Sequence, residues 1–121
     1  MKVLLADDHA LFREGVRMVL ENLSDEKLDV VEAGDFTQVL NLVRGGSDFD
    51  VALVDLSMPG MDGLSAIGAI RRAAPDIYLV VISASEDPPT IRKALDSGAH
   101  GYICKSAGSA SMMEGIRSVL G

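Results

Sequence analysis

A regular alternation of short apolar runs and amphipathic segments is the feature of this chain that most restricts its fold. The apolar runs are rich in Val, Ile and Leu, which is typical of strands buried on both faces of a sheet. Each run is followed by a segment whose apolar residues recur at helical spacing. The predicted strands span residues 2–6, 28–33, 51–55, 77–82 and 101–104. Strands and helices that alternate in this way predict an α/β fold with a parallel sheet and helices on both faces.

Capping signals mark the starts of the predicted helices. The first helix is expected over residues 10–23, with apolar residues along one side. The later helices are expected to begin after Asp35, Asp62, Asp87 and Ser111, the last in a capping-box pattern with Glu114. The expected architecture is therefore five strands and five helices in one domain over residues 1–121.

Composition and charge exclude several classes of protein. Apolar residues make up 48% of the chain, which is typical of a globular domain with its own core. The formal net charge of −7 disfavours direct binding to nucleic acid and suits a site for a hard cation. Neither a membrane span nor a signal peptide is expected. Cys104 is the single cysteine, so we expect a buried thiol, no internal disulfide and a cytoplasmic location.

Reactive side chains follow four of the predicted strands. Asp7 and Asp8 come directly after the first strand, and Asp55 ends the third. Ser83 and Lys105 follow the fourth and fifth strands. The carboxyl ends of parallel strands lie at one edge of a sheet, and in the doubly wound order 2-1-3-4-5 the first and third strands are neighbours. We therefore expect the three carboxylates to share one crevice at that edge.

This set of side chains suits phosphoryl transfer to a carboxylate. Three carboxylates in one crevice repel one another unless a cation neutralises them. Mg²⁺ prefers oxygen ligands, Lys105 adds a positive point charge, and Ser83 adds a hydroxyl donor. The metal and Lys105 would neutralise charge on a phosphoryl group transferred to Asp55. His9 also lies beside the acidic pair, but we expect it at the surface, where the first helix begins, and not as a ligand.

Four motifs make the chain resemble the receiver domains of bacterial two-component response regulators, which have the CheY-like fold. They are VLLADDH at 3–9, VDLSMPGMDG at 54–63, VISAS at 81–85 and GYICK at 101–105. The resemblance covers essentially the whole chain. It implies a domain that takes a phosphoryl group from a sensor histidine kinase in the presence of Mg²⁺. Apart from its own phosphorylation and dephosphorylation, such a domain is not an enzyme.

The resemblance also implies a role for each acidic residue of the crevice. Asp55 corresponds to the phosphoacceptor and also contacts the metal. Asp8 corresponds to the direct Mg²⁺ ligand, and Asp7 to a carboxylate that holds the ion mainly through water. The backbone carbonyl of Ser57 corresponds to the remaining protein ligand of the metal.

The resemblance also implies roles for residues of the fourth and fifth predicted strands and their ends, on the other side of the site. Ser83 and Lys105 correspond to the hydroxyl and ammonium that bind phosphoryl oxygens. Tyr102 corresponds to the switch aromatic, whose ring turns inward as Ser83 is drawn to the phosphate. Many receivers have a proline after the lysine, joined by a cis peptide bond, whereas this chain has Ser106. A non-proline cis bond is costly, so either isomer of the Lys105–Ser106 bond is left open.

The segment LLADDHALFREGVRMVLE resembles the NarL/FixJ branch of this family, whose members carry a C-terminal LuxR-type helix-turn-helix domain. We expect a longer protein that controls transcription and contacts DNA through that domain, which is not in this chain. A stand-alone receiver is the alternative. The resemblance also implies homodimers that form on phosphorylation, through the first and fifth helices or through the fourth helix and fifth strand.

The sequence disfavours two other functions relative to that of a signalling receiver. A Mg²⁺-dependent phosphatase of the haloacid-dehalogenase-like family would need a second Asp two residues after Asp55, where this chain has Ser57. A degenerate receiver that serves only as an interaction module would lack an acidic residue, the acceptor or the lysine, and this chain has all of them. A nucleotide-binding fold is disfavoured because neither a G-x-G-x-x-G nor a P-loop pattern occurs.

Overall fold

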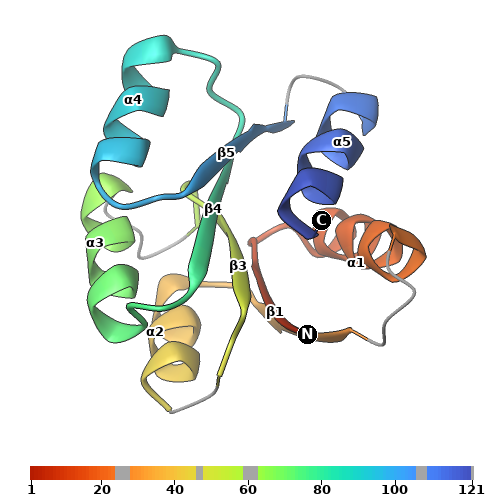
Figure 1. The fold of residues 1–121 in the computed structure, drawn as a ribbon, viewed down its shortest axis with the longest axis horizontal. Coiled ribbons are helices and arrows are strands. Elements are labelled where there is room, and N and C mark those ends of the chain that lie inside the picture. Colours follow the sequence, from red (N-terminus) through yellow and green to blue (C-terminus); the bar gives the residue numbers. More distant parts are fainter. Residues whose placement is uncertain (24–27, 46–47, 59–62, 106–108, 121) are drawn as a thin grey trace.

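The computed structural model describes residues 1–23, 28–45, 48–58, 63–105 and 109–120, in which strands and helices alternate along the chain (Figure 1). The strands are β1 (Lys2–Ala6), β2 (Asp29–Ala33), β3 (Val51–Asp55), β4 (Tyr78–Ser83) and β5 (Gly101–Cys104). The helices are α1 (Ala10–Leu23), α2 (Phe36–Arg44), α3 (Gly63–Ala73), α4 (Pro88–Asp96) and α5 (Ser109–Leu120). The predicted number and order of elements are confirmed.

The five strands form one parallel sheet in the order β2-β1-β3-β4-β5, as the alternation predicts. In the register of the sheet, Ala6 lies opposite Val54 and Asp55 lies opposite Ile82. Ser83 lies opposite Cys104, one residue further along. The residues that follow β1, β3, β4 and β5 therefore meet at one edge, the carboxyl edge of the sheet.

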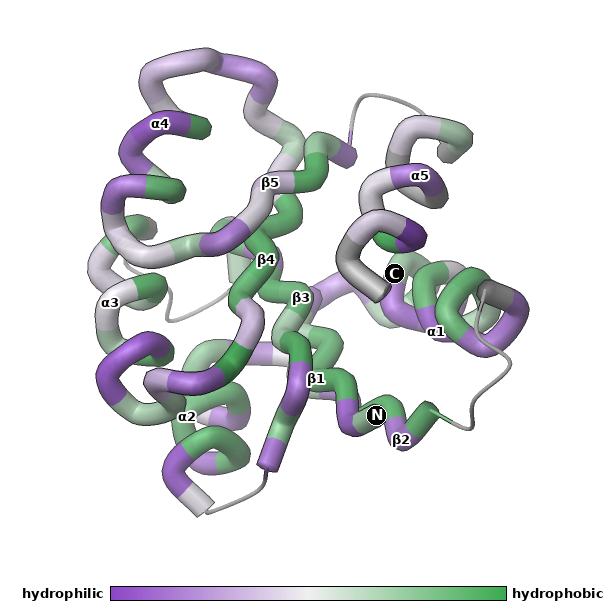
Figure 2. Tube along the Cα trace, viewed as in Figure 1, coloured by the Kyte–Doolittle hydropathy of each residue, from purple (hydrophilic) through white to green (hydrophobic). Residues whose placement is uncertain are grey.

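Both faces of the sheet are covered, so the central strands read as continuous apolar runs. Helices α2, α3 and α4 pack on one face, where strand residues such as Leu4 and Val81 point. Helices α1 and α5 pack on the other face, where Leu53 and Ile82 point. Figure 1 shows the two groups of helices on opposite sides of the strands, and Figure 2 shows that the central strands between them are largely hydrophobic.

Helix starts follow the predicted capping signals only in part. The Asp35 side chain caps α2 and accepts a hydrogen bond from the Gln38 N–H at 2.8 Å. Asp87 occupies the N-cap position of α4, but its carboxylate accepts from the Thr90 hydroxyl at 2.9 Å and not from a backbone N–H. The prediction that Ser111 caps α5 and that the helix begins after it is wrong: the helix begins at Ser109, so Ser111 lies in its first turn. Asp62 lies outside the described residues.

The position of Cys104 also differs from the expectation. Its side chain is half-buried, because it ends β5, a strand with a neighbour on one side only. The sulfur lies 3.6 Å from the Ser85 carbonyl oxygen.

Among the helices that the structure describes, none combines the length and the apolar character needed to cross a bilayer.

Candidate functional site

An acidic crevice lies at the carboxyl edge of the sheet, where β1 and β3 end. Asp7 and Asp55 are fully buried there, although both carry carboxylates. One ligand atom from each of Asp7, Asp8, His9 and Asp55 lies within 4.8 Å of the others. The structure therefore brings together the three carboxylates that the strand order predicts, and it adds an imidazole to them.

Lys105 closes the crevice from the side of β5. Its Nζ lies 2.9 Å from Asp55 Oδ2 and 2.6 Å from Asp7 Oδ2, so one ammonium pairs with both buried carboxylates. The same Nζ lies 4.2 Å from the centroid of the Phe12 ring on α1, within the range of a cation–π contact. Burial alone would lower the pKa of Lys105, but the bonds to Asp7 and Asp55 outweigh it and raise the pKa above its ordinary value of 10.5.

Asp55 is held on both of its carboxylate oxygens. Oδ1 accepts hydrogen bonds from the Ser57 N–H at 3.0 Å and from the Ser57 hydroxyl at 2.7 Å, and Oδ2 accepts from Lys105. Burial alone would raise the pKa of Asp55, but these bonds and the charge of Lys105 hold it below its ordinary value of 3.8. Asp55 is therefore an ionised carboxylate of fixed orientation.

Asp7 has a hydrogen bond on one carboxylate oxygen and an ion pair on the other. Oδ1 accepts from the His9 N–H at 2.8 Å. Oδ2 is buried and receives no hydrogen bond of good geometry from the described residues, but the Lys105 ammonium meets it at 2.6 Å. A buried carboxylate is costly unless positive charge or water meets it. The three carboxylates carry more negative charge than this one ammonium neutralises, so the group also fits a divalent cation that prefers oxygen ligands.

Ser83 and Tyr102 lie beside the crevice and are linked through the loop after β4. The Ser83 hydroxyl accepts from the Ser85 N–H at 3.2 Å, and the Tyr102 hydroxyl donates to the Ser85 carbonyl oxygen at 2.9 Å. Within the described part of the chain, the hydrogen bonds found on Asp55 come from Ser57 and Lys105, and none comes from Ser83. Ser106 lies outside the described residues, so the isomer of the Lys105–Ser106 bond stays open.

Two α1 residues belong to the site although the sequence reasoning did not select them. Phe12 lies under the Lys105 ammonium, and the Arg13 guanidinium donates to the Asp7 backbone carbonyl while pairing with Glu32 at 3.0 Å. Phe12 is on the apolar side of the first helix, close after the acidic pair, and that spacing could have indicated contact with the crevice. No comparable sequence signal links Arg13 to Glu32, because β2 and α1 meet only in the folded sheet.

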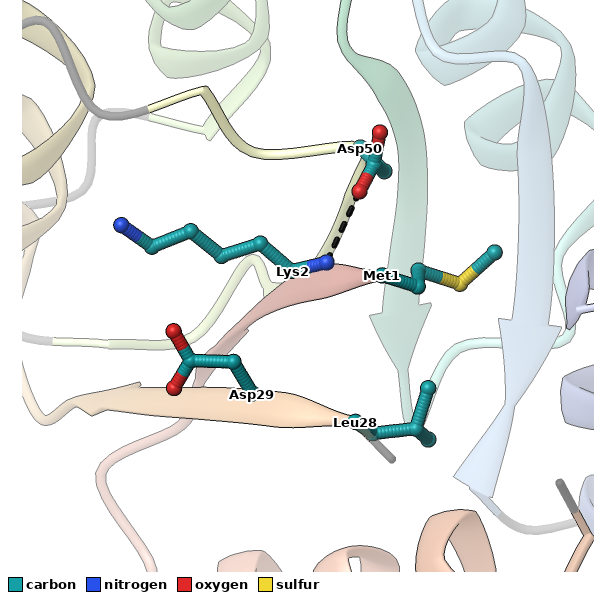
Figure 3. A pocket seen from close by; sticks show the side chains of 5 residues that line it. All are labelled: Met1, Lys2, Leu28, Asp29 and Asp50. Atoms are coloured by element: carbon teal, nitrogen blue, oxygen red, sulfur yellow. Dashed lines mark hydrogen bonds between the residues drawn. The ribbon is translucent and has the colours of Figure 1, made fainter. Parts of the chain in front are cut away.

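A cavity of about 600 Å³ lies at the opposite edge, lined by Met1, Lys2, Leu28, Asp29 and Asp50 (Figure 3). Its two carboxylates come from the amino-terminal ends of β2 and β3. Asp50 Oδ2 accepts from the Lys2 N–H at 2.8 Å, so that carboxylate closes the start of the sheet. This cavity is separate from the acidic crevice and provides matched control positions for experiments on it.

Comparisons with known proteins agree with the geometry. A sequence model of the family described as "Response regulator receiver domain" matches residues 3–117. The chain is 38% identical over 119 residues to the glycerol metabolism activator of Pseudomonas putida, with 98% of this chain and 53% of that protein covered. It is 36% identical over 117 residues to the nitrate/nitrite response regulator protein NarP of Escherichia coli K12, with 97% of this chain and 54% of NarP covered.

A solved structure gives the same result for the fold. The signal receiver domain of the putative response regulator NarL from Mycobacterium tuberculosis superposes with a TM-score of 0.80 at 34% identity, covering 98% of this chain and 94% of that chain. In contrast, this chain spans about half the length of the two relatives compared by sequence.

Proposed function

The chain belongs to the response regulator receiver domain family, and from that premise we propose that Asp55 accepts a phosphoryl group from a sensor histidine kinase. The observation that carries this proposal is the state of Asp55. Its carboxylate is fully buried at the end of the central strand, yet its pKa is held below 3.8 by Ser57 and Lys105. An ionised, oriented carboxylate is a nucleophile that can form an aspartyl phosphate.

The transfer needs positive charge around the phosphoryl oxygens, and the crevice supplies positions for it. The carboxylates of Asp7, Asp8 and Asp55 and the backbone carbonyl of Ser57 would hold Mg²⁺. When bound, Mg²⁺ neutralises charge on the transferred group. Lys105 binds a phosphoryl oxygen from the other side. A carboxylate oxygen of Asp55 attacks phosphorus, the phosphorus–nitrogen bond of the phosphohistidine breaks, and the leaving imidazole takes up a proton.

The contacts of Ser85 support a conformational switch that responds to phosphorylation of Asp55. Ser83 now accepts from the Ser85 N–H, and Tyr102 holds the Ser85 carbonyl. A phosphoryl group on Asp55 would draw the Ser83 hydroxyl toward it as a donor. That movement changes the loop that carries Ser85, and with it the position of Tyr102 at the surface formed by α4 and β5. Phosphorylation thereby alters an outer face of the domain.

The remaining proposals concern the protein as a whole. Residues 1–121 form one receiver domain of a cytoplasmic response regulator, and DNA is contacted by a LuxR-type helix-turn-helix domain beyond this chain. The length of the matched relatives supports that arrangement. Phosphorylation promotes homodimers through α1 and α5 or through α4 and β5. The domain acts as a phosphoacceptor and not as an enzyme on other substrates.

A phosphorylation assay tests the central proposal. The protein is incubated with Mg²⁺ and a small phosphodonor, and its intact mass is recorded; beryllofluoride with NMR gives a second readout. We expect the wild type to gain one phosphoryl group and Asp55→Asn to gain none. Asp29→Asn, in the cavity at the opposite edge, is the matched control and should behave as the wild type. An unmodified wild type, or an Asp55→Asn variant that is modified equally, contradicts the proposal.

A further inference from the structure

His9 is held beside the acidic crevice by its own backbone. Its N–H donates to Asp7 Oδ1 at 2.8 Å, and its carbonyl accepts from the Arg13 N–H at 3.0 Å, which starts α1. The residue is thus at the surface, as expected, with 68% of its side chain exposed. Its ring nevertheless turns toward the carboxylates: Nδ1 lies 3.2 Å from Asp7 Oδ1 and 3.2 Å from Asp8 Oδ1.

These separations match adjacent ligands of a single metal ion. Metal–ligand bonds of about 2.0–2.2 Å at right angles place neighbouring donor atoms about 3 Å apart. The Nδ1 atom has that spacing to two carboxylate oxygens and belongs to the same 4.8 Å group as Asp55. Its approach to Asp7 Oδ1 also has the length of a hydrogen bond, so the ring is held beside the carboxylates. The three carboxylates of the group carry more negative charge than the single Lys105 ammonium that meets Asp7 and Asp55, which favours the entry of a cation.

We propose that His9 Nδ1 is a metal ligand, and that it makes this site prefer transition-metal ions over Mg²⁺. Carboxylate and carbonyl oxygens suit Mg²⁺ and Mn²⁺, whereas an imidazole nitrogen favours ions such as Co²⁺, Ni²⁺ and Zn²⁺. The inference rests on the metal site of the proposed function and adds a nitrogen donor to its oxygen ligands. Phosphoryl transfer to Asp55 does not require this ligand.

A different role for His9 has different consequences. As a protonated ion-pair partner of Asp7 and Asp8, His9 would occupy the place of the cation and compete with every divalent ion alike. Its removal would then change the affinity for every divalent ion by the same factor, either increasing it or leaving it as it was. If His9 is a ligand, its removal weakens the binding of ions that prefer nitrogen and changes the binding of Mg²⁺ much less. The ratio of the Ni²⁺ affinity to the Mg²⁺ affinity therefore separates the two roles.

The first experiment measures dissociation constants of Mg²⁺ and Ni²⁺ by calorimetry for the whole 121-residue chain and for His9→Gln. We expect the variant to lose Ni²⁺ affinity by about tenfold or more, within the range for a disturbed metal site, and Mg²⁺ affinity by less than about threefold. His100→Gln is the matched control, because His100 is the other of the two histidines in the chain and its Nδ1 accepts from the Leu79 N–H. In His100→Gln, the ratio of the Ni²⁺ affinity to the Mg²⁺ affinity should equal that of the wild type.

The second experiment has its main readout in the wild type itself. Pulsed electron paramagnetic resonance of the Cu²⁺-loaded wild type should show modulation from the imidazole of a coordinated histidine, because imidazole suits Cu²⁺. Labelling the histidines with ¹⁵N should shift that modulation, and it should be absent in His9→Gln and kept in His100→Gln.

Equal changes of the Mg²⁺ and Ni²⁺ affinities in His9→Gln, or no imidazole modulation in the wild type, overturn the proposal for His9. The phosphorylation of Asp55 by a phosphodonor with Mg²⁺ then still stands. If the wild type binds none of these ions and gains no phosphoryl group, the metal site of the proposed function fails as well.

Discussion

The Lys105 ammonium lies 2.9 Å from Asp55 Oδ2, although the two residues are 50 positions apart in the chain. The fold brings them together because both follow strands that end at the carboxyl edge of the sheet. This pair decides the charge state of the crevice. Without the bonds to Lys105 and Ser57, burial would favour the protonated form of Asp55.

Lys105→Met should therefore reduce the pH dependence that Asp55 contributes in metal-free buffer. In the wild type the folded pKa of Asp55 is below 3.8, so its stabilisation is present above pH 3.8 and is lost as pH falls through the folded pKa. In the variant the Ser57 bonds remain, but the bond and the charge of Lys105 are lost, so the folded pKa of Asp55 rises and its stabilisation shrinks. The melting temperature of the variant should therefore fall further below that of the wild type as pH rises from the acidic range to neutrality.

Thermal unfolding with EDTA at several pH values measures this effect. At neutral pH we expect a loss of about 3 kcal/mol, the order found when one partner of a buried ion pair is removed. Lys93→Met, on the exposed side of α4, is the control and should show no such trend. A difference between Lys105→Met and wild type that stays constant with pH would contradict the role assigned to the ammonium.

Mg²⁺ should stabilise the folded protein, and Asp8 should carry much of that effect. An ion at 100 times its dissociation constant adds about 2.7 kcal/mol to the free energy of unfolding. Asp8→Asn removes a carboxylate from the group of ligand atoms, so the rise in melting temperature on adding Mg²⁺ should largely disappear. Asp29→Asn should keep the full rise. An Asp8→Asn variant with a wild-type response to Mg²⁺ and EDTA would remove Asp8 from the site.

Tyr102→Phe should loosen the loop between β4 and α4. The hydroxyl of Tyr102 donates to the Ser85 carbonyl oxygen at 2.9 Å, and a typical hydrogen bond of this kind contributes about 0.5–1.5 kcal/mol. We expect a loss of that size and faster amide hydrogen exchange over residues 84–87. Tyr78→Phe keeps the ring that stacks on His100 and serves as the control. Unchanged exchange in Tyr102→Phe would show that this bond does not hold the loop.

Two glycines in helices should respond differently to substitution by alanine. Gly15 lies in α1, and a Cβ there would meet nothing within 4 Å, so Gly15→Ala should stabilise the protein by up to about 1 kcal/mol through helix propensity. A Cβ on Gly115 in α5 would meet Ile103 Cγ1 at 3.1 Å, so Gly115→Ala should gain less or destabilise. Denaturant unfolding of both variants checks the order; a Gly115→Ala variant as stable as Gly15→Ala would show that α5 shifts at no cost.

The sequence predicts the fold closely because its signals are local. Apolar runs, helical periodicity and the Asp35 cap each depend on neighbouring residues, and their alternation leaves few topologies. The error at the start of α5 has the same origin. Ser111 and Glu114 form a recognisable capping pattern, but the chain enters the helix earlier, at Ser109. A capping pattern shows that a start is possible at a position and does not exclude an earlier one.

The sequence by itself determined which side chains collect at the carboxyl edge, because strand order and strand ends follow from the alternation of elements. Only the tertiary structure decided how these side chains meet. The Phe12 ring under Lys105, the two bonds from Ser57 to Asp55 and the imidazole of His9 beside two carboxylates depend on side-chain orientations. Those orientations are selected by burial and by partners from elements distant in the chain, which a local pattern does not contain.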